Sequence, residues 1–315
     1  MTELTLIENV EQHAFMLDYI YEFQAGFAGA FPEAKVQPAS GIHLKRQLLR
    51  LFRRTYRHLP LGALGLGTPG LRRQGKTFSV MCGNDFAYCV PSCFTSAESY
   101  VYIFDAWPRD NAVLVDWVRL FGIKKVFLSA LQSTELFNQA LGEKEARGVW
   151  VPEGLEAREY FYWPYDRKDI DVIEFGRRNE PYHQRIVPVL ARAGFSHYDK
   201  RGRVHAPLAR SKVSICFPSS ITHPARAEFI STMTLRYLQS MACKCLVVGA
   251  MPQDMRQLFD YPAVIEVDPD RPGEQLVEIL KNFNAYVPLI EKNYETVIRG
   301  HQWRNRMAII RQHIL

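Results

Sequence analysis

Apolar and polar residues follow two rhythms along this chain, which predict strands and helices in turn. Short apolar runs bounded by turn residues predict buried strands, and the segments between them have the longer period of amphipathic helices. The predicted strands are residues 77–85, 100–108, 124–129, 148–154, 169–176, 212–220, 245–250 and 263–269. The predicted helices are residues 110–121, 131–142, 181–194, 232–243, 273–284 and 286–315, and residues 1–40 have a looser helical rhythm. This alternation is typical of parallel sheets with helices on both faces.

The segment 155–168 interrupts the alternation with aromatic and polar residues and one proline. It predicts a link, so we expect a first α/β domain over residues 1–165 and a second over residues 166–290. A length of 315 residues suits two such domains. Ligands of open parallel sheets bind at the carboxyl ends of the strands, so functional residues are expected there.

Composition and charge narrow the classes of function. A net charge of +6 and a pI of about 8.9 favour anionic partners, which include nucleotides, nucleic acid, acidic glycans and anionic lipid. No apolar run is long enough for a membrane span, and the first residues lack a signal-peptide pattern, which predicts a cytoplasmic protein. The six cysteines form no CxxC pair and no zinc spacing with histidine, so no metal site is predicted.

Hydroxyl residues and an arginine open the predicted helix 232–243. Ser231, Thr232 and Thr234 lie where this helix should begin, and Arg236 follows two residues later. A helix amino-terminus favours a phosphate through its free N–H donors and its dipole, and an arginine can bind the same anion with two N–H groups. The stretch therefore predicts a phosphate site, although serine and threonine also cap helices that bind nothing.

Two further strand ends carry cationic residues. One predicted strand ends at Gly176, which permits a ligand to approach the backbone closely, and Arg177 and Arg178 follow at once. Another strand leads into a loop with His223, which can hydrogen-bond a sugar or a phosphate. Both loops predict part of an anion site at the strand ends. The alternatives are a solvated basic loop and a histidine without a ligand.

Four stretches, in order, resemble the "group 1" or family 4-like glycosyltransferases. Residues 237–248, YLQSMACKCLVV, resemble the family's helix-then-strand signature LEAMACGLPVV. Two earlier stretches resemble the strands that precede the link and open the second domain, and the tail resembles the closing helix of CgeB-like members. The residues that carry these likenesses are Ser129, Pro152, Glu153 and Gly154, then VIEFGRR at residues 172–178, then His301, Trp303 and Arg306. The resemblance covers about residues 124–315.

This resemblance implies the GT-B fold, in which two Rossmann-like domains with parallel sheets face each other across a cleft. It implies that the second domain binds a nucleotide-sugar donor such as a UDP- or GDP-sugar, and that the first receives the acceptor. It implies that a last helix, residues 291–315, returns to the first domain, and that arginines rather than a metal or cofactor neutralise the leaving diphosphate. The residues then expected at the donor are Gly176, Arg177, Arg178, His223, Ser231, Thr232, Thr234, Arg236 and Gln239.

The sequence departs from the family at its acidic positions. Retaining members carry two glutamates in an E-x7-E motif, and Ser231 and Gln239 stand at those positions here. Arg236 stands where CgeB-like members have an arginine, which is consistent with a contact to the diphosphate, and Lys244 replaces the usual glycine. The missing acids leave open whether transfer retains or inverts stereochemistry, and whether the protein is active.

An inverting enzyme needs a base for the acceptor's proton. Asp105, at the end of a predicted strand of the first domain, is the residue expected in this role, and Asp85 is the second choice. Asp105 is equally suited to cap the turn before Trp107. Residues 43–59 form a basic amphipathic stretch, for which a solvated helix, a helix lying on anionic lipid and a nucleic-acid contact are three interpretations.

We therefore expect a metal-independent glycosyltransferase of polysaccharide biosynthesis, cytoplasmic or peripheral on the inner face of the membrane. It would transfer a hexose-type sugar from a nucleotide-diphosphate sugar to a glycan, a lipid-linked precursor or another hydroxyl acceptor. Two other classes stay open. One is a non-catalytic GT-B protein that binds a nucleotide-sugar or serves as a partner subunit. The other is a different enzyme on the same fold, either a phage-type DNA glycosyltransferase or a nucleotide-sugar epimerase.

Overall fold

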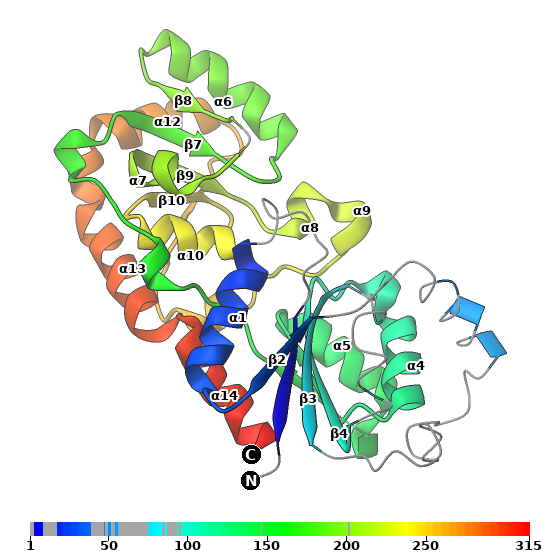
Figure 1. The fold of residues 1–315 in the computed structure, drawn as a ribbon. Helices are drawn as coiled ribbons and strands as arrows, with labels where there is room; N and C mark the ends of the chain where they lie inside the picture. The colour runs from blue at the N-terminus through cyan, green and yellow to red at the C-terminus, as the bar shows by residue number, and fades with distance from the viewer. Residues whose placement is uncertain are drawn as a thin grey trace. The chain divides into compact units, whose positions relative to one another are not determined.

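The computed structural model describes residues 3–8, 18–38, 75–83, 96–145, 147–200 and 202–315, together with Gln47, Arg50, Leu51, Arg54, Thr55, Phe86 and Cys93. The chain divides into two compact units, one of Met1–Pro152 with Met307–Leu315 and one of Glu153–Arg306. Each unit contains a parallel sheet with helices packed against it (Figure 1). Asp85 and most of the basic stretch 43–59 lie outside the described residues, so what the sequence predicts for them stays a prediction.

The described part of the first unit is built on a six-stranded parallel sheet, in the order β2-β1-β3-β4-β5-β6. Its strands are β1 (Leu4–Glu8), β2 (Lys35–Pro38), β3 (Lys76–Cys82), β4 (Glu98–Phe104), β5 (Lys125–Leu128) and β6 (Gly148–Trp150). Its helices are α1 (Asp18–Ala30), η3 (Pro108–Asp110), α4 (Asn111–Phe121), α5 (Leu131–Leu141), η4 (Glu143–Glu145) and the last part of α14 (Trp303–Ile314). Figure 1 shows α1 on one side of this sheet and α4 and α5 on the other.

Successive residues of β4 explain why both faces of this sheet are covered. Tyr102 and Phe104 pack with Phe23 of α1, whereas Val101 and Ile103 lie in the core formed with α4 and α5. All four strand residues are buried. The strand is therefore apolar without alternation, as expected for a parallel strand buried on both sides.

The alternation predicted for the first half is confirmed from β3 onward. The helical rhythm predicted for residues 1–40 holds for α1 and is wrong at both of its flanks, which form β1 and β2. β1 pairs in parallel with β2 on one side and with β3 on the other. Strands of four or five residues are too short to show a clear period, so pairing with distant residues decides their conformation.

The second unit has a five-stranded parallel sheet, in the order β11-β10-β9-β7-β8. Its strands are β7 (Ile170–Glu174), β8 (His197–Tyr198), β9 (Ser211–Cys216), β10 (Leu246–Gly249) and β11 (Ile265–Glu266). Its α-helices are α6 (Glu180–Arg192), α7 (His205–Ala209), α8 (Ser219–Thr222), α9 (Pro224–Ala227), α10 (Leu235–Ala242), α11 (Met255–Leu258), α12 (Pro272–Lys281) and α13 (Val287–Gly300). Its short 3-10 helices are η5 (Ala157–Glu159), η6 (Tyr165–Arg167) and η7 (Phe283–Tyr286).

Helices cover both faces of this second sheet. α6 and α12 pack together on one face, and α10 and α13 pair on the other (Figure 1). Val172, Val213 and Leu246, from three neighbouring strands, share a buried cluster with apolar residues of α6 and α12. Among the described residues, none of the helices combines the length and the apolar character needed to cross a bilayer.

The segment that the sequence predicts as a link packs onto the second unit. The Trp163 N–H donates to the carbonyl of Ala209. The buried ammonium of Lys168 donates to the carbonyls of Ser211 and Cys243, at 2.7 and 2.9 Å. These contacts attach the later part of this polar, aromatic stretch to the second unit, in agreement with a compact unit that begins at Glu153.

α10 ends in a backbone conformation for which the family signature uses glycine. Lys244 follows the cap residue Cys243 and has a φ of +51°, in the left-handed region. Its ammonium lies 2.7 Å from the Glu291 carboxylate and 4.3 and 4.7 Å from the ring centres of Tyr162 and Tyr294. The ion pair and the two rings therefore offset the cost of a side chain at this position.

We expect Lys244→Ala to lower the free energy of unfolding by about 1–2 kcal/mol, because the contacts of the ammonium are lost while the left-handed backbone stays. Lys244→Gly loses the same contacts but relieves about 1 kcal/mol of backbone strain, so it should be the more stable variant. Urea denaturation of both variants measures the difference. Equal stability of the two would contradict the backbone strain assigned to residue 244.

Candidate functional site

The winding of the second sheet changes direction between β7 and β9. β7 pairs on one side with β8, the next strand along the chain, and on the other side with β9. In open α/β sheets, ligands bind beyond the carboxyl ends of two strands that are related in this way. The residues that follow β7 include Gly176 and Arg177, and those that follow β9 include Phe217 and His223. The switch point therefore coincides with two of the loops that the sequence selects.

Arg236 of α10 joins these two strand ends. Its guanidinium donates to the carbonyl of Arg177 and to the carbonyl of Phe217, both at 2.8 Å. Gly176 has a φ of +70°, and a Cβ placed there would lie 3.0 Å from Arg236 Cδ. The glycine thus leaves room for the arginine, whose side chain is only half-buried.

We expect Gly176→Ala to lower the free energy of unfolding by about 1–2 kcal/mol and to displace the Arg236 side chain. Gly194→Ala is the matched control, because Gly194 has a similar φ of +77° but nothing within 4 Å of its added Cβ. Urea denaturation and nucleotide titration of both variants measure the two effects. Weaker nucleotide binding in the Gly176 variant alone is the expected result. Equal binding in both variants would show that Gly176 is not part of the nucleotide site.

Positive charge gathers around His223 at the same place. Burial lowers the pKa of His223, and the charges of Arg177, Arg226 and Arg236 lower it further. The imidazole is therefore neutral at neutral pH, and its buried Nδ1 has no hydrogen-bond partner among the described residues. In the part of the chain that the structure describes, Arg177 and Arg236 have no carboxylate within ion-pair distance. The cluster is thus suited to an anion.

The start of α10 is held by two carboxylates of the protein itself. The Leu235 N–H donates to the Glu153 carboxylate at 2.6 Å. The Thr232 hydroxyl and the Met233 N–H donate to Asp254, at 2.6 and 2.7 Å. Asp254 is deeply buried, and burial raises the pKa of its carboxyl to about 6. Two of the amino-terminal groups expected to face a phosphate, the Leu235 N–H and the Thr232 hydroxyl, are therefore already bonded.

The hydroxyls of the opening stretch have different surroundings. Ser231 Oγ accepts a hydrogen bond from the Gln253 N–H at 3.3 Å. Thr234 is the N-cap residue of α10, and its buried Oγ1 has no hydrogen-bond partner among the described residues. Thr234 therefore remains the hydroxyl of this stretch that can bind a ligand beside Arg236.

Two predicted donor residues face other partners. Arg178 pairs with Glu180 and Asp199, each at 3.0 Å, on the surface. Gln239 is buried and donates to the Tyr160 hydroxyl at 2.9 Å. The structure thus brings together Gly176, Arg177, His223 and Arg236, with Thr234 two residues before Arg236 in the chain, and it gives Arg178 and Gln239 contacts within the protein.

The residue expected as a base belongs to the first unit. Asp105 directly follows β4 and has a φ of +56°, a conformation that few residues other than glycine, asparagine and aspartate adopt. It is half-buried. Asp85, the second choice, lies outside the described residues.

The sequence did not single out Glu153 as an anchor for α10, nor Asp254, nor Arg226 as part of the cationic cluster. Glu153 and Leu235 are 82 positions apart, and Asp254 and Thr232 are 22 apart. Contacts over such separations leave no local pattern. Arg226 could have been predicted as part of the cluster, because it stands in the same strand-end loop as His223.

No protein-family model matches the chain, and no curated protein matches it in sequence. Solved structures match it over its whole length. Anabaena HepE in complex with UDP-glucose superposes with a TM-score of 0.62 at 10% identity, over 100% of both chains. A glycosyltransferase from Rickettsia africae gives a TM-score of 0.59 at 10% identity, over 99% of this chain and 98% of that one. Sucrose-phosphate synthase from Thermosynechococcus elongatus gives 0.58 at 11% identity, with the same coverage.

These likenesses define the fold class. The chain has the two-domain α/β GT-B fold that the sequence predicts, with two parallel sheets and alternating strands and helices. At these identities the likeness establishes the fold, and the function rests on the residues of the site.

Proposed function

We propose that this protein is a glycosyltransferase that uses a nucleoside-diphosphate sugar as donor and binds its diphosphate in the second unit. The observation that carries the proposal is the group of three arginines, Arg177, Arg226 and Arg236, around a neutral His223 at the switch point of the sheet. Structures of Anabaena HepE, which has the same fold, contain UDP and UDP-glucose. A donor of this class is the ligand that both the fold and the charge favour.

The chemistry of transfer explains why arginines suit this position. The bond between the sugar and the diphosphate breaks through an oxocarbenium-like state, and negative charge grows on the leaving phosphate. Fixed guanidinium groups stabilise that charge, and each donor removed from such a site typically slows the reaction about 100- to 1000-fold. Arg236 is held in place by two backbone carbonyls, so it needs little rearrangement when the charge develops. In this proposal the arginines neutralise the diphosphate and no metal is needed.

We also propose Asp105 as the base that takes the acceptor's proton if the enzyme inverts. Its position after β4 is the carboxyl end of a strand, and its left-handed backbone points to a fixed placement of the carboxylate. Asp105→Asn tolerates the same backbone conformation and removes the base. The proposed acceptors remain a glycan, a lipid-linked precursor or another hydroxyl compound.

A thermal-shift panel with UDP, GDP, ADP, CMP and dTDP tests the donor site. A ligand at 100 times its dissociation constant stabilises the folded protein by about 2.7 kcal/mol, which is a clear shift. A rise with one diphosphate is expected and names the donor base. No rise with any nucleotide would contradict the donor site.

Release of nucleotide and free sugar from the matching donor separates an enzyme from a binding protein. Water then acts as the acceptor, so the assay needs no knowledge of the natural one. Slow hydrolysis that is reduced by Asp105→Asn, with unchanged nucleotide binding, is expected for an inverting transferase. Binding without hydrolysis or transfer would favour the non-catalytic alternative, for which the missing family glutamates at Ser231 and Gln239 are the supporting observation.

A further inference from the structure

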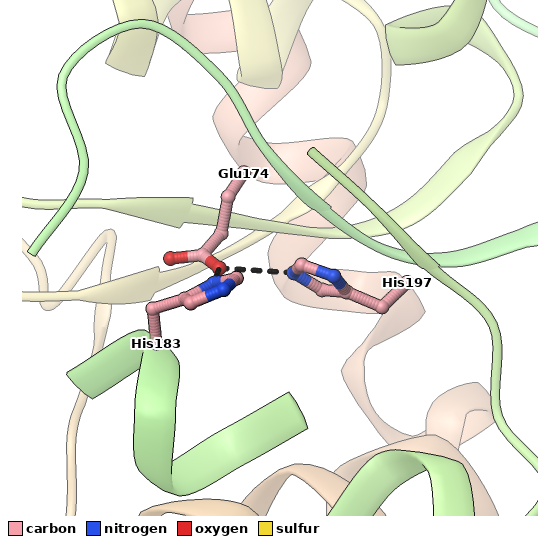
Figure 2. Close-up of side chains that lie close together, drawn as sticks. All are labelled: Glu174, His183 and His197. Atoms are coloured by element: carbon pink, nitrogen blue, oxygen red, sulfur yellow. Dashed lines mark hydrogen bonds and ion pairs between the residues drawn. The ribbon is translucent and has the colours of Figure 1, made fainter. Parts of the chain in front are cut away.

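Three side chains that could bind a metal ion meet at the end of β7, and none of them belongs to the group of Arg177, Arg226 and Arg236. Glu174 ends β7, His183 lies on α6 and His197 on β8. Figure 2 shows both imidazoles directed at the same carboxylate. Glu174 Oε2 lies 2.5 Å from His183 Nδ1 and 2.9 Å from His197 Nε2, and the three ligand atoms lie within 4.8 Å of one another.

The carboxylate of this cluster is buried beside its two histidines. Glu174 is buried, with a side chain 4% exposed, and the side chains of His183 and His197 are only 15% and 11% exposed. Among the described residues, no lysine or arginine lies within ion-pair distance of Glu174. A buried carboxylate is costly unless a cation or several hydrogen bonds compensate it. Apart from the two imidazoles, the described residues show no group that compensates this carboxylate.

We propose that Glu174, His183 and His197 bind a divalent transition-metal ion of the Zn²⁺ class. Two imidazole nitrogens and one carboxylate oxygen are a ligand set that suits Zn²⁺, with a fourth position left for water. The ion would supply positive charge to the buried carboxylate, and each imidazole would bind it through an unprotonated ring nitrogen. The two histidines lie 9 and 23 positions after Glu174, which is no recognised zinc spacing, so this site could not be predicted from the sequence.

The ion would have a structural role in the second unit. β8 has two residues and pairs only with β7 among the described strands, so few hydrogen bonds hold it. An ion bound by one residue each from β7, α6 and β8 would fasten this edge strand and the helix to the end of β7. Gly176 and Arg177 follow Glu174 closely, so the same ion would also fix the start of the loop that carries them.

The test uses the full chain, stripped with a chelator, and Zn²⁺ or Co²⁺ alone as the probe. Calorimetric titration should show one tight Zn²⁺ site per chain, and Co²⁺ should give the visible absorption of a tetrahedral site. Loss of a residue that only hydrogen-bonds to a metal ligand typically weakens metal binding by about 10- to 100-fold. Removing one of the three ligands should weaken Zn²⁺ binding by more than that. Binding should also weaken in acid, because protons compete with the ion for the ligand nitrogens.

Two variants and one control test whether Zn²⁺ binds at these three residues. Glu174→Gln keeps the shape and a hydrogen-bond acceptor but removes the charge, and His197→Ala removes one ligand; both should lose the site. His205 is a histidine of the same unit whose ring centre lies 5.0 Å from that of Tyr160, and the His205→Ala variant should bind Zn²⁺ as the wild type does. The proposal is overturned if the wild type binds no Zn²⁺, which would indicate an imidazolium–carboxylate pair instead. Unchanged binding in both ligand variants would overturn it as well.

Discussion

Arg236→Ala is expected to weaken nucleoside-diphosphate binding by about 10- to 150-fold. The variant loses a guanidinium that can make charge-assisted hydrogen bonds to the diphosphate, worth about 1.5–3 kcal/mol. Turnover should fall further, by about 100- to 1000-fold, because the interaction strengthens as charge grows on the leaving group. Titration of the nucleotide found in the thermal-shift panel measures the first effect, and donor hydrolysis measures the second.

Two further variants separate binding from folding. Arg236 also donates to the carbonyls after β7 and β9, so Arg236→Ala is expected to lose stability, and its unfolding must be measured alongside. Arg236→Lys keeps the charge but not the paired N–H groups, and it should recover binding only in part. Arg178→Ala removes an arginine of the same loop that pairs with Glu180 and Asp199, and it should bind nucleotide normally. Equal losses in the Arg178 and Arg236 variants would refute a specific diphosphate contact.

Acid is expected to destabilise the second unit through His301. This imidazole is buried, and its Nδ1 accepts a hydrogen bond from Arg306 at 2.7 Å, so it is neutral in the folded protein. Burial, and then the charge of Arg306, lowers its pKa from 6.5 to about 3. Between these values the unfolded chain binds more protons than the folded one, so stability falls as the pH drops. The slope is about 1.4 kcal/mol per pH unit, and the loss reaches about 4–5 kcal/mol.

His301→Gln isolates this effect, because the glutamine oxygen can accept from Arg306 but does not titrate. Asp254 works in the opposite direction: burial raises its pKa to about 6, so its protonation favours the folded state below that pH. The wild-type curve is therefore the sum of opposing slopes. The difference between wild type and variant, from urea denaturation at several pH values between about 3 and 6.5, reports His301 alone. Parallel curves for the two proteins would contradict the assignment.

The tail residues that carry the family resemblance have a structural explanation. Trp303 N–H donates to the carbonyl of Leu155, and Arg306 donates to the carbonyl of Glu153. A Cβ at Gly154 would lie 2.9 Å from Trp303 N, so this glycine lets the two segments touch. His301, Trp303 and Arg306 therefore hold the segment whose Glu153 also anchors α10, which makes them supports of the site rather than ligand contacts.

The fold was predictable where apolar patterns were long, and the residues of the candidate site that lie close together are mostly those that follow a strand directly. The strand that ends before Gly176 and the helix after Thr234 lie close to their predicted places. The predicted helix 232–243 begins at Leu235 instead, because Asp254 binds Thr232 and Met233 before it, and Glu153 binds the N–H of Leu235 itself. β8 was missed because two residues show no period. His197, which reaches Glu174 across 23 positions, was missed for the same physical reason as Glu153 and Asp254.

Lys244 ties the identity of one residue to others far along the chain. A glycine at this position needs no partner, whereas a lysine with a φ of +51° is stabilised by Glu291, Tyr162 and Tyr294. In related proteins we therefore expect these positions to covary. A basic residue at position 244 should occur together with the acid at 291 and the rings at 162 and 294, whereas a glycine at 244 should place no constraint on those positions. A search pattern that demands the glycine would miss this chain.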